Sequence, residues 1–141
     1  MGKLSLPGIA VGNIFQIVIG TLLRLGLAAA FVYARDGHFS GREQMASASA
    51  SETYVLVAEI ATFLVLILSG YIAAFIAKQY ELQNGTHAAF LYVAQSIHVL
   101  RTGHSMHSLG VQLINVVFPP FFCLLGGYIR KRVAVPKLRT S

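Results

Sequence analysis

Four apolar stretches separated by polar segments form the main pattern of the chain. The clearest covers 53–79, where Val, Leu, Ile, Ala and Phe dominate and Glu59 is the only charged residue before Lys78. A helix of about 20 apolar residues crosses the roughly 30 Å hydrocarbon core of a bilayer. At helical spacing, polar and small residues fall on one face of this stretch and large apolar residues on the others. The pattern predicts a membrane-spanning helix with one face against protein.

The other apolar stretches predict three more helices, over 8–34, 87–105 and 109–129. The third is short for a crossing; a full crossing is the preferred interpretation, and a tilted or re-entrant segment is the alternative. Pro119 and Pro120 remove two backbone donors and predict a kink in the last helix. The predicted fold is an all-α, integral membrane four-helix transmembrane bundle in a single domain.

The polar segments predict the connections between these helices. The outer loop, 35–52, is rich in Ser and Ala and predicts a mobile segment or a weak helix. The inner turn, 80–86, contains Asn84-Gly85, which is a turn signal and a helix stop. Asn84 also begins an N-glycosylation pattern, but the short turn and the orientation derived below argue against a glycan there. The tail, 130–141, is basic.

Composition and charge place the chain in a membrane and orient it. Hydrophobic residues make up 55% and charged residues 11%, whereas a soluble domain carries about 25% charge. Five of the eleven Lys and Arg residues lie in the last twelve positions, so the net charge of +6 belongs to a membrane-flanking tail rather than to a nucleic-acid surface. With four spans, seven Lys and Arg residues flank the side of the two termini and three the other side. This bias predicts N-in/C-in topology.

This topology gathers polar side chains in the outer half of the membrane. Arg24 and Glu59 are the natural pair, because pairing lowers the cost of holding either charge in lipid. A fold-specifying ion pair within a polar network is the first interpretation. A binding or proton-linked site open to the outer side is the second. The predicted network consists of Arg24, Glu59, Gln95, His98, Gln112 and Asn115.

Small residues line the remaining parts of the same helix faces and predict close helix packing. The predicted packing residues are Gly12, Gly20, Ser69, Gly70, Ala73, Ala77 and Gly126. Asn13 and Gln16 are exceptions, because both are polar and lie in the inner half without an evident partner in the sequence.

The candidate chemistry is sparse. One cysteine, Cys123, excludes a disulfide within the chain. His98, His104 and His107 would converge only if the third helix frays near Gly103, and no carboxylate lies nearby in sequence to orient them. We therefore expect no metal, no cofactor and no enzymatic activity.

Small residues and prolines recur in the last three apolar stretches, with Gly-Tyr-Ile-Ala-Ala at 70–74, Asn-Gly at 84–85, Pro-Pro at 119–120 and Gly-Gly-Tyr at 126–128. Over 54–132 this layout resembles several uncharacterised bacterial families of small four-helix integral membrane proteins. The resemblance implies a multi-pass protein of the bacterial inner (cytoplasmic) membrane. These families carry no agreed activity.

The sequence favours a non-enzymatic membrane protein that acts by association. Its partners would be the lipid bilayer and another membrane protein, to which it is an accessory subunit, binding partner or inhibitor, or a second copy of itself. The alternative is an oligomeric small transporter or channel that uses an outer-facing Arg24/Glu59 polar pocket. Neither function involves nucleic acid.

Overall fold

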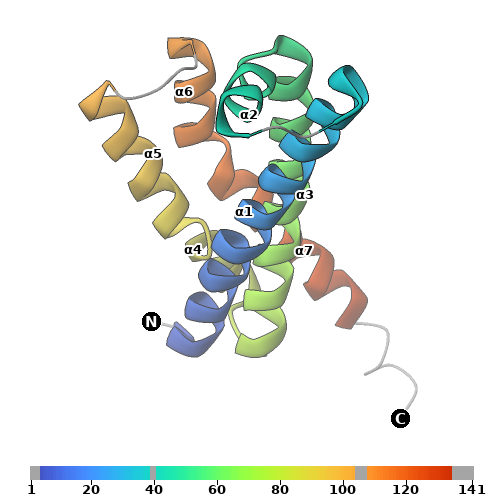
Figure 1. The fold of residues 1–141 in the computed structure, drawn as a ribbon. Coiled ribbons are helices and arrows are strands. Elements are labelled where there is room, and N and C mark those ends of the chain that lie inside the picture. The colour runs from blue at the N-terminus through green and yellow to red at the C-terminus, as the bar shows by residue number, and fades with distance from the viewer. Residues whose placement is uncertain (1–3, 39–40, 104–107, 135–141) are drawn as a thin grey trace.

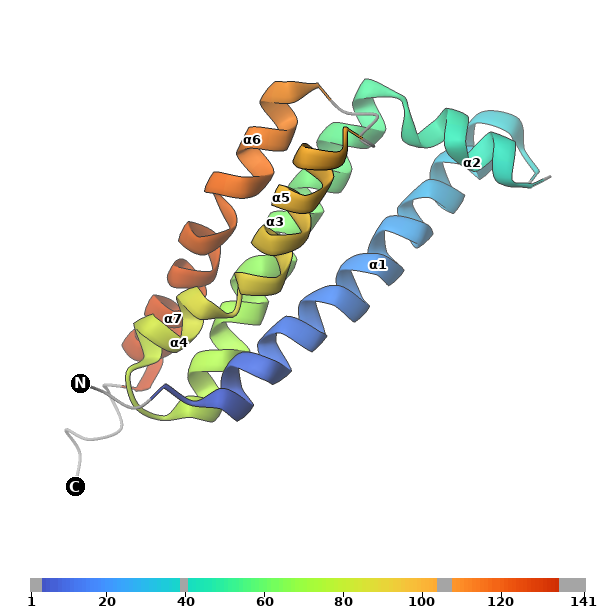
Figure 2. The ribbon, with the colours of Figure 1, turned by 90° about the vertical axis from the view of Figure 1, so that its left-hand side faces the viewer.

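The computed structural model describes residues 4–38, 41–103 and 108–134, and every regular element in them is helical. The helices are α1 (Leu6–Asp36), α2 (Arg42–Ser49), α3 (Glu52–Ala77), α4 (Glu81–His87), α5 (Phe90–Thr102), α6 (Leu109–Val117) and α7 (Pro119–Ala134). In Figures 1 and 2, α1 runs toward the end that holds α2, α3 returns, α5 runs toward that end again, and α6 and α7 return. The start of α1, the short helix α4 and the end of α7 therefore lie at one end, and α2 lies at the other.

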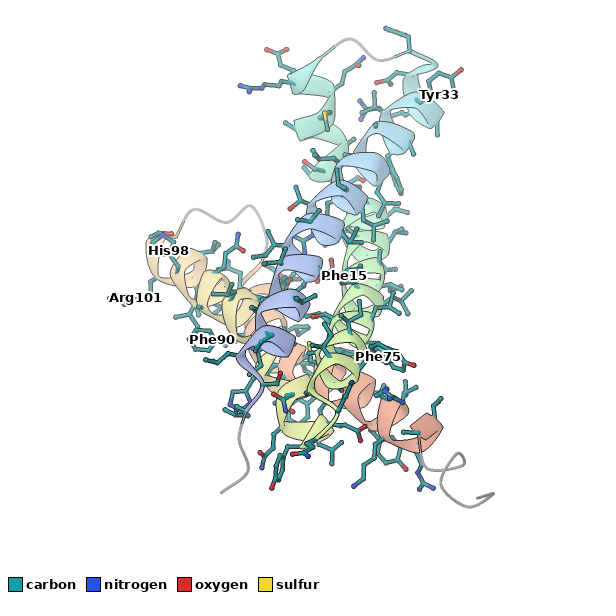
Figure 3. All side chains as sticks on the ribbon, turned by 90° about the horizontal axis from the view of Figure 1, so that it is seen from below. Phe15, Tyr33, Phe75, Phe90, His98 and Arg101 are labelled. Atoms are coloured by element: carbon teal, nitrogen blue, oxygen red, sulfur yellow. The ribbon has the colours of Figure 1, made fainter. Side chains whose placement is uncertain are left out.

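Three helices are long and apolar enough to cross a membrane: α1, α3 and the segment 109–134 formed by α6 and α7. Large apolar side chains also cover the outside of the molecule. Tyr33, Phe75 and Phe90 are each more than half exposed (Figure 3). A surface of this kind suits lipid rather than water as the surrounding solvent. These features indicate a multi-pass membrane protein.

The third predicted span is shorter than expected. Within 87–105, helix α5 holds 13 residues, which rise about 20 Å and do not cover a hydrocarbon core of about 30 Å. Residues 104 and 105 lie outside the described part of the chain. Helix α5 is therefore shorter than the predicted span, because the chain breaks between α4 and α5.

The side chain of Asn13 occupies this break. In an unbroken helix the Leu91 N–H would donate to the His87 carbonyl. Instead Leu91 N–H donates to Asn13 Oδ1 at 3.0 Å, and Asn13 Nδ2 donates to the His87 carbonyl at 3.4 Å. The amide thus inserts between the two groups of one helical hydrogen bond, which is a recognised cause of a kink. Asn13, whose partner the sequence does not reveal, is buried and joins α1 to the break between α4 and α5.

The predicted inner turn, 80–86, is also wrong, since most of it forms α4. The reversal lies earlier, at Lys78 and Tyr80, whose φ angles of 57° and 50° are left-handed. Gly85 serves packing instead of turning: a Cβ on it would lie 3.0 Å from the Cys123 carbonyl oxygen and 3.1 Å from the Gly127 Cα. The absence of a side chain lets α4 lie directly on α7.

Asn84 is fully buried within α4 and closes the end of the bundle. Its Oδ1 accepts the Ser5 N–H at 2.7 Å, and its Nδ2 donates to the carbonyls of Gln79 and Tyr80, each at 3.1 Å. The side chain therefore holds the start of α1 against the reversal after α3. An amide nitrogen buried and bonded in this way is not accessible to a glycosylating enzyme in the folded chain.

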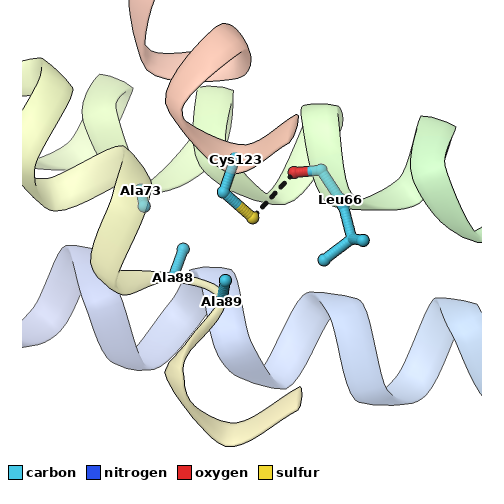
Figure 4. Packing of buried hydrophobic residues seen from close by; sticks show 5 residues of the cluster. All are labelled: Leu66, Ala73, Ala88, Ala89 and Cys123. Atoms are coloured by element: carbon cyan, nitrogen blue, oxygen red, sulfur yellow. Dashed lines mark hydrogen bonds between the residues drawn. The ribbon is translucent and has the colours of Figure 1, made fainter. Parts of the chain in front are cut away.

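The densest packing is the crossing of α3 and α7. A Cβ on Gly70 would collide with the Cys123 carbonyl, and one on Gly126 would collide with the Ile67 carbonyl. The Cys123 thiol is fully buried and donates to the Leu66 carbonyl at 3.2 Å (Figure 4). The two backbones touch without intervening side chains, as in other close-packed membrane helices.

Helix α1 packs on α3 by the same means, through Gly12, Ser69 and Ala73. The Ser69 hydroxyl donates to the Gly12 carbonyl at 2.8 Å, and a Cβ on Gly12 would lie 3.0 Å from the Ala73 Cβ. Ala77 is half-buried, and its backbone nitrogen lies 3.4 Å from the Cβ position of Gly8.

Gly20 does not take part in this packing. A Cβ on it would meet no described atom within 4 Å, so its prediction as a packing residue is wrong. The reason is the course of α5, which leans away from α1 beyond the joint at Asn13 (Figure 1). The face of α1 that carries Gly12 is covered, whereas the same face two turns later is open.

The last helix breaks where the prolines predict it. Helix α6 ends at Val117 and α7 begins at Pro119, because two consecutive residues without a backbone N–H cannot continue the hydrogen-bond ladder. Helix α7 continues to Ala134, so the first residues of the predicted basic tail are helical. Arg130 lies over the Phe75 ring, with its guanidinium carbon 5.0 Å from the ring centroid.

We predict that Gly126→Ala destabilises the fold by about 3 kcal/mol, because backbone atoms cannot rotate out of the way of the added Cβ. Gly20→Ala is the matched control: its Cβ enters open space, and the better helix propensity of Ala adds up to about 1 kcal/mol. Denaturation of the purified variants in detergent, followed by far-UV circular dichroism, measures both. Equal stabilities would contradict the close α3–α7 crossing.

We predict that Asn13→Leu speeds hydrogen exchange at the Leu91 amide and lowers stability by about 1–3 kcal/mol, the usual cost of orphaning a buried donor. Ile14→Leu, on the exposed side of α1, should change neither quantity. Amide exchange measured by NMR in detergent tests both variants. Unchanged exchange at Leu91 in Asn13→Leu would show that the amide does not hold the break.

Candidate binding site

A polar hollow of about 140 Å³ lies between α1, α3, α5 and α6. No residue of α4 or α7 lines it. Five of the six predicted network residues meet there, which places residues from four separate helices around one space. The wall of the polar hollow consists of Arg24, Glu59, Tyr92, Gln95, Ser96, Val99, Gln112 and Asn115.

The predicted ion pair is present but loose. Arg24 Nη2 lies 3.7 Å from Glu59 Oε1, which is longer than a charge-assisted hydrogen bond of about 2.7–2.9 Å. The closer partners of the guanidinium are neutral oxygens. Nε and Nη2 donate to the Thr62 hydroxyl at 3.3 and 3.2 Å, and Nη2 also donates to the Tyr92 hydroxyl at 3.3 Å. Arg24 is thus positioned mainly by hydroxyl groups.

Glu59 is bound from the other side of the hollow by Asn115. Asn115 Nδ2 donates to Glu59 Oε1 at 3.1 Å and to the Val111 carbonyl at 3.1 Å, while its Oδ1 accepts the Tyr92 hydroxyl at 2.6 Å. Tyr92 therefore links Arg24 to Asn115, which in turn donates to Glu59. Glu59 receives Asn115 Nδ2 and Arg24 Nη2 on the same carboxylate oxygen, Oε1.

Helix α3 fixes the backbone position of Arg24. The Tyr54 hydroxyl donates to the Arg24 carbonyl at 3.1 Å, and the Thr62 hydroxyl donates to the Ala58 carbonyl at 2.7 Å. Phe31 packs edge-on against Tyr54, with ring centroids 5.6 Å apart. The charged side of the hollow thus rests on the α1–α3 pair, whereas the opposite side rests on α5 and α6.

Two polar atoms in the wall have no partner within the described residues. Glu59 Oε2 is buried and accepts no hydrogen bond from that part of the chain. Arg24 Nη1 also makes no hydrogen bond or ion pair with those residues, but it is not buried, because the Arg24 side chain is 41% exposed. The loose ion pair therefore leaves one acceptor and one donor group unused. The arrangement can bind a polar molecule through both.

His98 does not belong to the site. It is exposed on α5 and lies on the side of that helix turned away from α1 and α3 (Figure 3). At 100° per residue, position 98 lies about a third of a turn from the centre of the face that carries the wall residues of α5. His104 and His107 lie outside the described residues. Among the described residues, no three His, Cys, Asp or Glu side chains group closely enough to hold a metal ion.

Tyr92, Ser96 and Val99 also line the polar hollow and are absent from the predicted network. Together with Gln95 they follow the i, i+3, i+4, i+7 spacing of one helix face, so helical periodicity alone would place them beside Gln95. Gln16 is different: both polar atoms of its side chain are buried with no partner in the described residues. The structure gives no physical account of this residue.

We predict that Arg24→Gln and Glu59→Gln are coupled. Each single change leaves one charge without its opposite, so the double variant should be less destabilised than the sum of the two singles by about 0.5–3 kcal/mol. Arg24→Gln combined with Glu52→Gln, an exposed acid in the first turn of α3, should show no coupling. Unfolding free energies in detergent give both values. A zero coupling for the first pair would contradict a stabilising ion pair.

Comparisons with known proteins do not assign the chain to a family. No family model matches it, and searches of curated proteins and of solved structures return no match. The resemblance to uncharacterised bacterial four-helix families therefore stays a prediction.

Proposed function

We propose that this chain is a non-enzymatic protein of the bacterial cytoplasmic membrane that acts by association with another membrane protein. In this proposal the chain makes four passes, both termini are cytoplasmic, and the third pass consists of α4 and α5 together. The main support for the proposal is the solvent exposure of α5 and α6. Neither helix contains a single buried residue.

The exposed surface of α5 and α6 combines large apolar side chains with polar ones. Phe90, Ile97 and Leu113 are all more than 40% exposed, and Gln95 and His98 are exposed on the same hairpin. A polar side chain facing lipid costs on the order of a few kcal/mol. A partner helix would cover the apolar side chains and bond the polar ones, which lipid alone does not do.

The rest of the chain acts as a support for this hairpin. The glycine contacts between α3 and α7, and between α4 and α7, hold the other end of the molecule rigidly. A chain that packs tightly at one end and presents an uncovered hairpin at the other suits an accessory subunit or an inhibitor.

The second candidate is an oligomeric small transporter or channel, and the polar hollow favours it. The tightly packed half of the molecule around α4 argues against transport through a single copy. The residues buried together there include Gly12, Ala73, Ala88 and Cys123. A path through one copy would have to cross this region. Transport would therefore require a second copy or a large rearrangement.

Native mass determination in mild detergent separates the two candidates. A complex of fixed stoichiometry with a different membrane protein is the expected result. A homodimer would favour the transporter, and a monomer under all mild conditions would contradict both. The paired change Arg24→Gln with Glu59→Gln should leave the heteromeric complex intact, whereas a transporter should lose flux.

Site-specific photocrosslinking in membranes tests which surface is used. A photoreactive residue at Ile97 on α5 should crosslink to the protein found in the native complex. The same residue at Leu22, exposed on α1, is the matched control and should react with lipid. Equal crosslinking from both positions, or lipid adducts alone, would show that the hairpin is not the docking surface.

A further inference from the structure

The polar hollow contains one positive and one negative side chain, and neither of them uses all of its hydrogen-bonding groups in contacts with the described residues. Its wall carries one guanidinium and one carboxylate, and its six other side chains are neutral. Arg24 and Glu59 approach each other through Nη2 and Oε1 alone, at 3.7 Å. Glu59 Oε2 is buried without a donor from the described residues. A carboxylate oxygen left in this state is costly, so a ligand that donates to it gains more than an ordinary hydrogen bond.

This balance selects the charge of the ligand. An anion at Arg24 would sit beside the carboxylate, and a cation at Glu59 would sit beside the guanidinium. Either would leave an unmatched charge in a site where charges interact more strongly than in water. A molecule with one positive and one negative group matches both. Its acid group would accept from Arg24 Nη1, and its ammonium group would donate to Glu59 Oε2 after a turn about the broad terminal torsion of the glutamate.

The opposite wall supplies neutral polar groups at the same level. Gln95 and Ser96 belong to α5, and Gln112 belongs to α6. The volume of about 140 Å³ is close to that of an engineered cavity of about 150 Å³ that holds benzene. The space therefore suits a molecule of about six to eight non-hydrogen atoms, by the same comparison.

We propose that the polar hollow binds a compact zwitterion, in which an ammonium group and an acid group lie on neighbouring atoms or a short linker. Two sources carry this chemistry: a free α-amino acid and the headgroup of an ethanolamine phospholipid. The site does not depend on a protein partner, so it can exist whether or not the chain acts by association.

The test uses the full chain in an uncharged detergent and in lipid nanodiscs. Saturation-transfer NMR compares L-alanine with isobutyrate, which lacks the ammonium group, and with isopropylamine, which lacks the acid group. Native mass spectrometry compares retention of phosphatidylethanolamine and phosphatidylglycerol. Binding of alanine at least tenfold tighter than of both analogues identifies a free solute. Selective retention of phosphatidylethanolamine identifies a lipid headgroup.

The variants separate binding from folding. Arg24→Gln and Glu59→Gln should each weaken binding at least tenfold, whereas Arg35→Gln, whose partner is Asp36 outside the hollow, should not. Ser96→Phe fills the hollow and keeps both charged residues, so it should abolish binding even if the charge variants fold poorly. The proposal is wrong if neither zwitterion binds, if a singly charged analogue binds equally well, or if Ser96→Phe binds like the unmodified chain.

Discussion

The backbone contact between α3 and α7 is the constraint on which the rest of the structure depends. At Gly70 and Gly126 each helix lies directly on the peptide groups of the other, and a single added carbon would force them apart. In lipid no hydrophobic effect drives helices together, so close van der Waals contact of this kind must supply much of the association energy. α4 joins the same contact through Gly85 and Gly127. The close packing of helices at this end of the molecule therefore depends on glycines, which have no side chain to keep the backbones apart.

The polar hollow is the counterpart of that tight end. Because α1, α3, α4 and α7 meet closely there, α5 and α6 are free to diverge, and the space between them and α1 is lined by polar side chains. Arg24, Glu59, Tyr92 and Asn115 then form one connected network across four helices. The same network holds the diverging hairpin to the rest of the chain, so fold and site share their interactions.

Much of this arrangement follows from sequence pattern, and the exceptions have physical reasons. Apolar periodicity predicts the long helices, and the depth of polar residues along them predicts that Arg24, Glu59, Gln95, Gln112 and Asn115 meet. Asn84-Gly85 was the misleading signal, because a glycine needed for close approach looks the same in sequence as a glycine needed for a turn. The break before α5 was not predictable for a related reason. It depends on Asn13, which is distant in sequence and bonds to backbone groups that every residue possesses.

The break beside Asn13 determines the direction of α5 relative to α4. Helix α5 is about 20 Å long and is attached at one end by a connection of two residues, Ala88 and Ala89. A rotation of about 10° there would carry the far end of α5 through about 3 Å, given that length, which is roughly the width of a water molecule. The angle between α4 and α5 therefore affects the width of the polar hollow, although the break that sets this angle lies outside the hollow. Asn13 bonds the backbone at that break and does not line the hollow, so it bears on the room inside the hollow without being part of its wall.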